Sequence, residues 1–234
     1  MVGLRLCIET SGDTSSLALF KGPDRLVDEV SWNKKKSGQE LATHSLKILL
    51  EKNNFKSSEI SSISLSQGPG SFTGLRVGFN LAKVLCFSHK IPVTLLDSLL
   101  VQATSYMKVN SGKSVLVVNN AQKNLFFVGM YKDFETQIKP TVMSADELFN
   151  VVKEPADAIG NAVQLLLSNT SKSLNSLLNA RLDFPNYGTA TDAGYVSYTV
   201  SQLSEITDYN LLTPLYLRPS QAEENLALGV IKPQ

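Results

Sequence analysis

Apolar runs of strand length alternate with helical repeats along the first half of the chain. Three such runs, separated by Gly-containing turns, predict an antiparallel start to a sheet. A stripe that includes Leu41, Ile48 and Leu49 then recurs every three to four residues, as on one side of a helix. The elements predicted in this half are strands over residues 4–9, 16–21, 26–31, 60–66 and 91–95 and helices over 39–54, 73–88 and, capped by Asp97 or Ser98, up to residue 107.

The second half begins again with strands. Residues 114–118, 125–131 and 158–160 predict strands, and 161–168 and 192–203 predict helices. The run Ser144-Ala145-Asp146-Glu147 is a capping box that opens one more short helix. The order strand-strand-strand-helix-strand-helix places helices against a mixed sheet, so the sequence predicts an α/β fold with a second α/β lobe.

Composition changes this picture little. The 234 residues suffice for one large domain or two small lobes, with 43% hydrophobic and 18% charged residues. The formal net charge is +1 and the only basic run is Lys34-Lys35-Lys36, which makes the chain a poor nucleic-acid binder on its own. Cys7 and Cys86 lie in apolar runs and are expected to be buried free thiols. We expect a cytoplasmic protein, because no apolar stretch approaches the roughly 18 residues of a membrane span and no signal peptide is visible.

A glycine-rich turn, Gln67-Gly68-Pro69-Gly70-Ser71-Phe72-Thr73-Gly74, separates the strand at 60–66 from the helix at 73–88. Free N–H groups at such a helix start can bind an anion. The turn lacks the spacing of the dinucleotide fingerprint, the lysine of a Walker A loop and the serine of a hydrolase elbow. Two interpretations stay open: a close helix–strand crossing that requires small residues, and an anion site.

The helix after this turn is apolar on almost every side. Over residues 77–87 only Asn80 and Lys83 are strongly polar, whereas a surface helix normally has a polar face. Either two lobes of this chain bury the helix or a partner covers its second face. Gly78 and Ala82, four residues apart, would allow another helix to approach closely.

Residues that typically carry catalysis or hold metals are sparse. His44 and His89 are the only histidines, and no cluster has the spacing of metal ligands. A serine nucleophile motif is missing as well. Glu9 and Asp13 lie at and just after the end of the first strand, where a water-mediated metal contact and a turn-stabilising role are both open. We therefore predict no catalytic residue and no metal site.

At this point the chain resembles a known family, TsaB, also called YeaZ. The matching segments are Leu6-Cys7-Ile8-Glu9-Thr10-Ser11 with Ser16-Leu17-Ala18-Leu19, His44-Ser45-Leu46 with Leu49-Leu50, the run from Gln67 to Gly78, Pro92 with Ser98-Leu99, and Leu215-Tyr216-Leu217-Arg218. The run from Gln67 to Gly78 resembles the family's most specific signature almost throughout. The resemblance is strong over residues 4–105 and patchy afterwards.

That resemblance implies the actin-like ATPase (ASKHA) fold, in which two ribonuclease-H-like lobes carry mixed sheets flanked by helices and the second lobe is reduced. The expected domains are residues 1–105, 106–212 and an extended C-terminal segment, 213–234. It also implies a non-catalytic scaffold subunit that is required for threonylcarbamoylation of adenosine 37 in tRNA. Such a subunit pairs with TsaD and helps to recruit TsaE, forms a homodimer when alone, and meets tRNA only through the complex. No cofactor is expected, since ATP binding would be weak or absent.

Two sets of residues carry these expectations. The expected partner interface lies on the helices at 39–54 and 73–88 and comprises Leu41, His44, Ser45, Ile48, Leu49, Arg76, Val77, Leu81, Val84 and Leu85. The expected anion or nucleotide site comprises Glu9, Thr10, Ser11, Gly68, Gly70 and Ser71.

The chain departs from the family pattern in two places. Relatives run approximately Asp-Ala-Arg, two residues, Glu-Val-Tyr, whereas this chain has Asn120-Ala121-Gln122-Lys123-Asn124-Leu125-Phe126-Phe127, so the Asp, Arg and Glu are all replaced. The first strand ends in Glu9 rather than the commoner Asp, which weakens the case for a nucleotide–metal site. Two alternatives stay open: a metal- or nucleotide-dependent, glycoprotease-like hydrolase acting alone, and a nucleotide-binding regulatory module.

Overall fold

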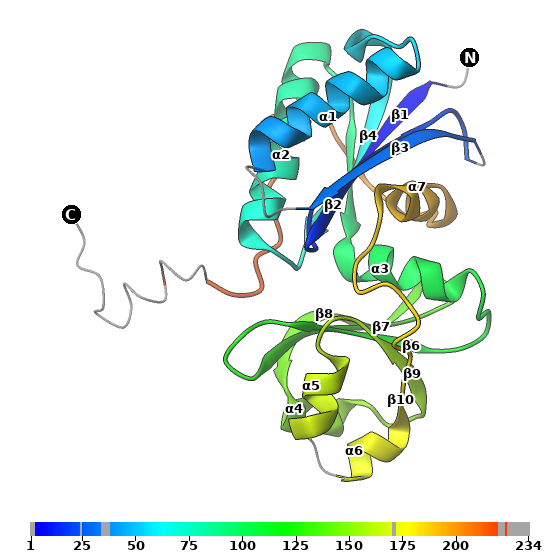
Figure 1. The fold of residues 1–234 in the computed structure, drawn as a ribbon, viewed down its shortest axis with the longest axis vertical. Helices are drawn as coiled ribbons and strands as arrows, with labels where there is room; N and C mark the ends of the chain where they lie inside the picture. The colour runs from blue at the N-terminus through cyan, green and yellow to red at the C-terminus, as the bar shows by residue number, and fades with distance from the viewer. Residues whose placement is uncertain (1–2, 24, 34–37, 170–171, 220–222, 224–234) are drawn as a thin grey trace.

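Two β-sheets, one in each lobe, organise the computed structural model, which describes residues 3–23, 25–33, 38–169, 172–219 and 223 (Figure 1). The lobes follow one another along the long axis of the molecule, with helix α3 between them. The basic run at 34–36 and most of the expected tail after residue 219 lie outside the described residues.

The first sheet has six strands in the order β11-β5-β4-β1-β2-β3. The strands are β1 (Leu4–Glu9), β2 (Thr14–Phe20), β3 (Leu26–Asn33), β4 (Ile60–Gly68), β5 (Val93–Asp97) and β11 (Glu205–Ile206). Strand β1 pairs antiparallel with β2 and parallel with β4. The three-strand antiparallel start and the mixed sheet predicted from the sequence are therefore both confirmed.

The second sheet repeats this arrangement. Its strands are β6 (Val115–Asn120), β7 (Leu125–Lys132), β8 (Glu135–Ser144), β9 (Ala156–Ile159) and β10 (Leu178–Ala180), in the order β10-β9-β6-β7-β8. Strand β6 pairs antiparallel with β7 and parallel with β9, as β1 does with β2 and β4. In both lobes three consecutive antiparallel strands are joined by two parallel ones, which is the ribonuclease-H-like topology.

Helices cover both faces of the first sheet. They are α1 (Gly38–Lys52), α2 (Phe72–His89), α3 (Ser98–Met107) and α7 (Ala190–Thr199), together with the short 3-10 helices at Ser57–Glu59 and Tyr209–Leu211. Figure 1 shows α1 and α2 on one face and α3 and α7 on the other. The second lobe adds α4 (Ala145–Val151), α5 (Val163–Asn169) and α6 (Lys172–Leu177) on the face of its sheet away from α3.

The alternation of side chains along β1 explains why helices are needed on both faces. Leu6 and Ile8 point into the core under α1 and α2, whereas Cys7 points into the core that α3 and α7 share. That second core also takes in Val115 and Tyr131 from the other lobe, so one continuous apolar cluster joins the lobes. Cys7 and Cys86 are buried free thiols, as expected, and burial raises the pKa of the Cys7 thiol to about 12.

The structure contains α6, β8, β10 and β11, none of which the sequence predicted, and it changes the boundary of the second lobe. Strand β8 was not predicted, because Glu135–Ser144 starts with polar residues and contains Pro140, a residue that edge strands tolerate. The predicted range 106–212 for the second lobe does not hold for its last part. There α7 packs on the first sheet and β11 pairs with β5, because the apolar face of α7, including Ala193 and Val196, belongs to the core shared with Cys7. Within the described residues no helix is both long and apolar enough to cross a membrane.

Gly78 provides a test of how closely α2 must approach β1. A Cβ atom there would press on the Thr10 hydroxyl and would lie 3.2 Å from Leu65 Cδ1 and 3.4 Å from Ile8 Cγ2. We expect Gly78→Ala to lower the free energy of unfolding by about 1–3 kcal/mol, because overpacking forces the helix away from the sheet. Denaturant unfolding measures the effect. Asn80→Ala, at an exposed position on the same helix, is the control and should change stability by less than about 0.5 kcal/mol. A Gly78→Ala protein as stable as its parent would contradict this packing argument.

Candidate functional site

The glycine-rich turn is held between two other segments of the chain. Ser71 caps α2 by accepting a hydrogen bond from the Gly74 N–H, and its own N–H donates to the Ser11 carbonyl over 2.7 Å. On its other side the Leu215 N–H donates to the Gln67 carbonyl, also over 2.7 Å. The turn therefore joins the end of β1 to the C-terminal segment.

These contacts explain why glycines occupy the turn. A Cβ atom on Gly70 would lie 2.5 Å from the Ser11 carbonyl oxygen, and one on Gly68 would lie 2.6 Å from the Leu215 carbonyl oxygen. Gly68 also has a φ of +118°, a conformation that disfavours side chains. Both glycines are thus explained by close approach to another backbone segment, which differs from the helix–strand crossing that the sequence left open. Gly78 faces the sheet, and Ala82 is buried in the core that α1, α2 and the sheet share.

The residues of the expected anion site are largely bonded to one another. Glu9 is buried, and its Oε1 accepts hydrogen bonds from the Ser11 N–H and hydroxyl over 2.5 and 2.6 Å. The Gly68 N–H donates to the Ser98 hydroxyl over 2.9 Å. Ser11, Gly70 and Ser71 line a cleft between the lobes, whereas Glu9, Thr10 and Gly68 do not. Anion binding at this turn stays a prediction.

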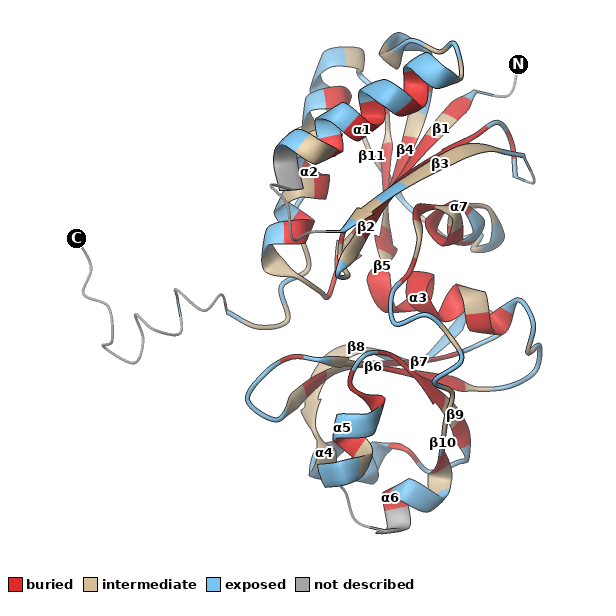
Figure 2. Ribbon diagram, in the orientation of Figure 1, coloured by how far each residue is buried: buried red, intermediate tan, exposed pale blue. Residues whose placement is uncertain are grey.

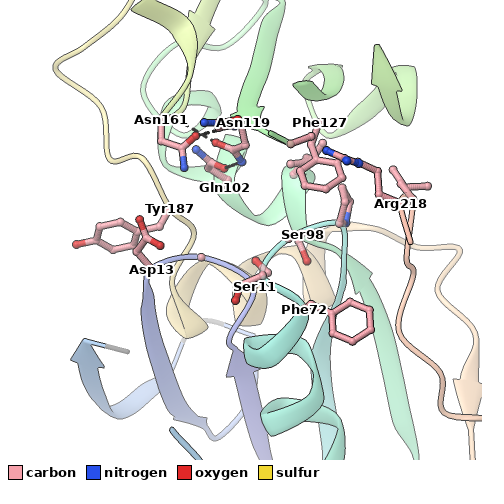
Figure 3. Close-up of a pocket in the computed structure, with 18 of the residues that line it drawn as sticks. Ser11, Asp13, Phe72, Ser98, Gln102, Asn119, Phe127, Asn161, Tyr187 and Arg218 are labelled. Atoms are coloured by element: carbon pink, nitrogen blue, oxygen red, sulfur yellow. Dashed lines mark hydrogen bonds between the residues drawn. The ribbon is translucent and has the colours of Figure 1, made fainter. Parts of the chain in front are cut away.

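The cleft itself has a volume of about 410 Å³ (Figure 3). Its first-lobe wall comes from the turns that follow β1 and β4 and from the start of α3. Its second-lobe wall comes from the ends of β6 and β9, and the C-terminal segment completes it. Figure 3 shows Gln102 grouped with the Asn119–Asn161 pair, with Ser11 below them and Ser98 to one side.

The C-terminal segment 215–218 spans the two lobes at the side of this cleft. The Tyr216 ring stacks on the ring of Phe72 with centroids 4.2 Å apart. An Arg218 nitrogen donates to the Gln122 carbonyl over 3.2 Å. Gln122 begins a run of three residues with positive φ, 122–124, so the β6–β7 turn has an unusual backbone where the segment meets it. Sequence reasoning predicted an extended segment here but not its bridging position.

Carboxamide side chains from α3 and from the second lobe form one wall of the cleft, and none of them was predicted as a site residue. The Asn119 Nδ2 donates to Gln102 Oε1 over 2.7 Å, and the Asn161 N–H donates to Asn119 Oδ1 over 3.2 Å. Asn161 Oδ1 in turn accepts the Asn120 N–H over 2.8 Å. The sequence contained one indication of these site residues, the altered family pattern at 120–122 with amides in place of charged residues. That pattern did not show that the amides lie together at one cleft.

The outer surface of α1 and α2 contains only part of the expected partner interface. His44, Ile48, Arg76 and Val84 are exposed, and Leu41, Val77 and Leu81 are half-buried. Ser45, Leu49 and Leu85 are buried in the lobe's own core, because they lie on the helix sides that face the sheet, so their side chains are not available to a partner. Phe87, which the prediction omitted, is 56% exposed beside this surface. Figure 2 shows the exposed stripe along both helices.

A buried carboxyl links the two lobes behind the cleft. Asp97, at the end of β5, accepts the Leu99 N–H over 2.9 Å and the Tyr131 hydroxyl over 2.5 Å. Burial raises the pKa of the Asp97 carboxyl to about 6, although these hydrogen bonds oppose the shift. Burial and the Asp97 charge raise the pKa of Tyr131 well above its usual value.

Metal-ligating side chains do not gather in the described ranges: no group of three or more His, Cys, Asp and Glu residues there could hold a metal ion. The fold and the cleft place the chain in a structural class. Two lobes of ribonuclease-H-like topology that enclose an interlobe cleft define the actin-like ATPase (ASKHA) fold.

Within that class the comparisons with known proteins show the family. A family model described as TsaD, tRNA N6-adenosine threonylcarbamoyltransferase, matches residues 34–208, which is more than half of the chain. A solved structure of YeaZ from Pseudomonas aeruginosa has the same fold, with a TM-score of 0.74 at 18% identity over 92% of this chain and 100% of that chain. The chain belongs to the TsaB (YeaZ) family, within the wider group that the TsaD model describes.

The relatives differ in how much of their length is matched. The tRNA threonylcarbamoyladenosine biosynthesis protein TsaB of Bacillus subtilis (strain 168) is 27% identical over 93% of this chain and 95% of its own length. Two TsaB proteins from Buchnera aphidicola are 28% and 29% identical, and there the alignments span only 58% and 61% of the relative.

The Asp97–Tyr131 contact predicts a specific pH dependence of stability. The pKa of this carboxyl is about 6 in the folded protein and 3.8 without the fold, so between these values the folded state holds a proton that the unfolded state loses. The free energy of unfolding should therefore fall as the pH rises through this window, by about 3 kcal/mol at most.

Asp97→Asn keeps the helix cap and the acceptor for Tyr131 but cannot titrate, so it should remove this slope between pH 4 and 6. Denaturant unfolding at several pH values measures it. Asp146→Asn, at an exposed site, is the charge-matched control and should keep the slope. An Asp97→Asn protein with the parental slope would assign the titration to another group.

Proposed function

We propose that this chain is a non-catalytic partner subunit in the formation of threonylcarbamoyladenosine in tRNA. Its relatives that carry the TsaB name support a role in this modification, and one of them aligns over nearly its full length. A relative from Onion yellows phytoplasma that is named as the transferase itself is 27% identical over 68% of this chain, so membership of the wider group does not by itself decide whether the chain is an enzyme.

The observation that carries the proposal is the outer face of α1 and α2. Ile48 and Val84, 44% and 62% exposed, lie on this face with the half-buried Leu41, Val77 and Leu81. Large apolar side chains clustered on a surface mark contact sites between proteins. About 800 Å² of this face on each side would suffice for a specific dimer.

The proposed partner is a TsaD-type transferase that presents a similar pair of helices, and a second copy of this chain would occupy the same face when that partner is missing. Recruitment of TsaE and contact with tRNA would occur through the complex. We propose that this chain contributes no cofactor chemistry and binds ATP weakly or not at all. Support comes from the amides at 120–122, where relatives carry ionisable groups, and from Glu9, whose Oε1 accepts two hydrogen bonds from Ser11.

The test is binding of purified TsaD-type partner to variants of the exposed face. Val84→Asp and Ile48→Asp each place a charge in the proposed contact, so we expect at least tenfold weaker binding by calorimetry with an unchanged circular dichroism spectrum. Leu85→Asp is unsuitable, because Leu85 is buried in the core of its own lobe. Leu165→Asp, on α5 in the second lobe and 40% exposed, is the matched control and should bind normally. If both variants of the first lobe bind the partner as tightly as the parent does, the interface is elsewhere.

A further inference from the structure

We propose that the interlobe cleft binds a small organic oxyanion, a carboxylate or a phosphate ester, without a metal ion, and that side-chain amide N–H groups of helix α3 and of the second lobe recognise its oxygens. The cleft volume of about 410 Å³ lies in the range of sites for small organic molecules. The inference is independent of the proposed partner contact, which uses the outer face of α1 and α2 rather than the cleft.

Gln102 provides the main argument. Its side chain lines the cleft from α3 and is only 3% exposed, yet its Nε2 has no hydrogen-bond partner in the described part of the protein. The orientation of this amide is fixed by its neighbours. The Asn161 N–H requires an acceptor and so fixes Asn119 Oδ1, which leaves Asn119 Nδ2 to donate to Gln102 Oε1. The group of Gln102 without a partner is therefore the donor, and a buried donor without a partner is unfavourable.

Two further amides on the same wall are oriented in the same way. Asn161 Oδ1 accepts the Asn120 N–H over 2.8 Å, and Asn120 Oδ1 accepts the Gln122 N–H over 2.7 Å. The oxygens of these amides are thus occupied by backbone donors, and their Nδ2 groups remain to donate. A wall that presents three side-chain NH₂ groups favours a ligand that presents acceptor oxygens.

Ser98, one turn before Gln102 on α3, adds a further donor. The Ser98 hydroxyl oxygen accepts the Gly68 N–H over 2.9 Å, which leaves its proton to donate into the cleft that Ser98 lines. Ser98 is 3% exposed. A ligand in the cleft would receive hydrogen bonds from α3 and from the amides of the second lobe.

The charged residues that line the cleft favour an oxyanion over a metal complex as its ligand. Asp13 is the only carboxylate among the lining residues and Arg218 is the only cation, and Figure 3 places Asp13 with Tyr187 apart from the amide wall. Mg²⁺ and Ca²⁺ prefer oxygen ligands, above all carboxylates, whereas this wall presents N–H groups to its occupant. An oxyanion is complemented by those N–H groups and by the Arg218 charge, and it needs no divalent cation to neutralise it.

Side-chain NH₂ signals in nitrogen-resolved NMR spectra report directly on this site. We would titrate the protein in EDTA with ribose 5-phosphate, as the phosphate ester, and separately with succinate, as the carboxylate. The proposal expects saturable shifts of the Gln102 and Asn161 side-chain signals with at least one of the two, and which one responds identifies the kind of oxyanion. No saturable shift with either probe, or shifts only when Mg²⁺ replaces EDTA, would overturn the proposal.

Two variants test the recognition itself. Gln102→Glu and Asn161→Asp keep the oxygens that accept Asn119 Nδ2 and the Asn120 N–H but replace an NH₂ donor by an oxygen. Each should weaken binding of the responding probe at least tenfold. Gln164→Glu, an exposed change of equal charge on α5, should leave the affinity for the probe unchanged.

Asn161 is exposed, so its variant remains informative even where Gln102→Glu destabilises the fold. If Asn161→Asp binds the responding probe as tightly as the parent does, the amide wall does not take part in binding. Retained binding of a TsaD-type partner by these variants would show that the two proposals stand separately.

Discussion

Ser71 donates its backbone N–H to the Ser11 carbonyl over 2.7 Å, and this bond joins the two turns from which the first-lobe wall of the cleft is built. It forms only because position 70 has no Cβ atom, which would lie 2.5 Å from the same carbonyl oxygen. Glu9 stabilises the conformation of Ser11, because its Oε1 accepts hydrogen bonds from the Ser11 N–H and hydroxyl. This backbone contact fixes the start of α2 against the turn that follows β1, and Ser11, Gly70 and Ser71 there line the cleft.

The elements of the first lobe could be predicted because their patterns are local. The strand β1 is a short apolar run, and Asp97 is a recognisable cap for α3. Edge strand β8 lacked such a pattern, since its side chains are mostly exposed or half-buried and carry no clear alternation. The return of α7 and β11 to the first sheet is a long-range pairing that no local pattern encodes.

The same distinction applies to the two candidate sites. Periodicity showed that α2 is apolar on nearly every side, but it could not say which side faces the sheet. Leu85 and Val84 are adjacent in the sequence, yet one is 6% and the other 62% exposed. Gln102 could not be predicted as a site residue, because its orientation depends on the hydrogen bond from Asn119, a residue of the other lobe. Hydrogen-bond networks of this kind depend on side chains that meet only after the lobes have folded.

The amides Asn120 and Gln122 give the cleft a different electrostatic character from that of a nucleotide–metal site. Carboxylates in a partly buried cleft repel one another unless a cation binds between them, so such a site depends on its metal. Amides carry no net charge and can hydrogen-bond to each other, as Asn119 Nδ2 does when it donates to Gln102 Oε1. The cleft can therefore stay open between the lobes without a metal ion, while the inter-lobe core around Tyr131 holds the lobes together. An occupant is then selected by the direction of N–H groups rather than by charge, and the unpartnered Gln102 Nε2 is where that selection is strongest.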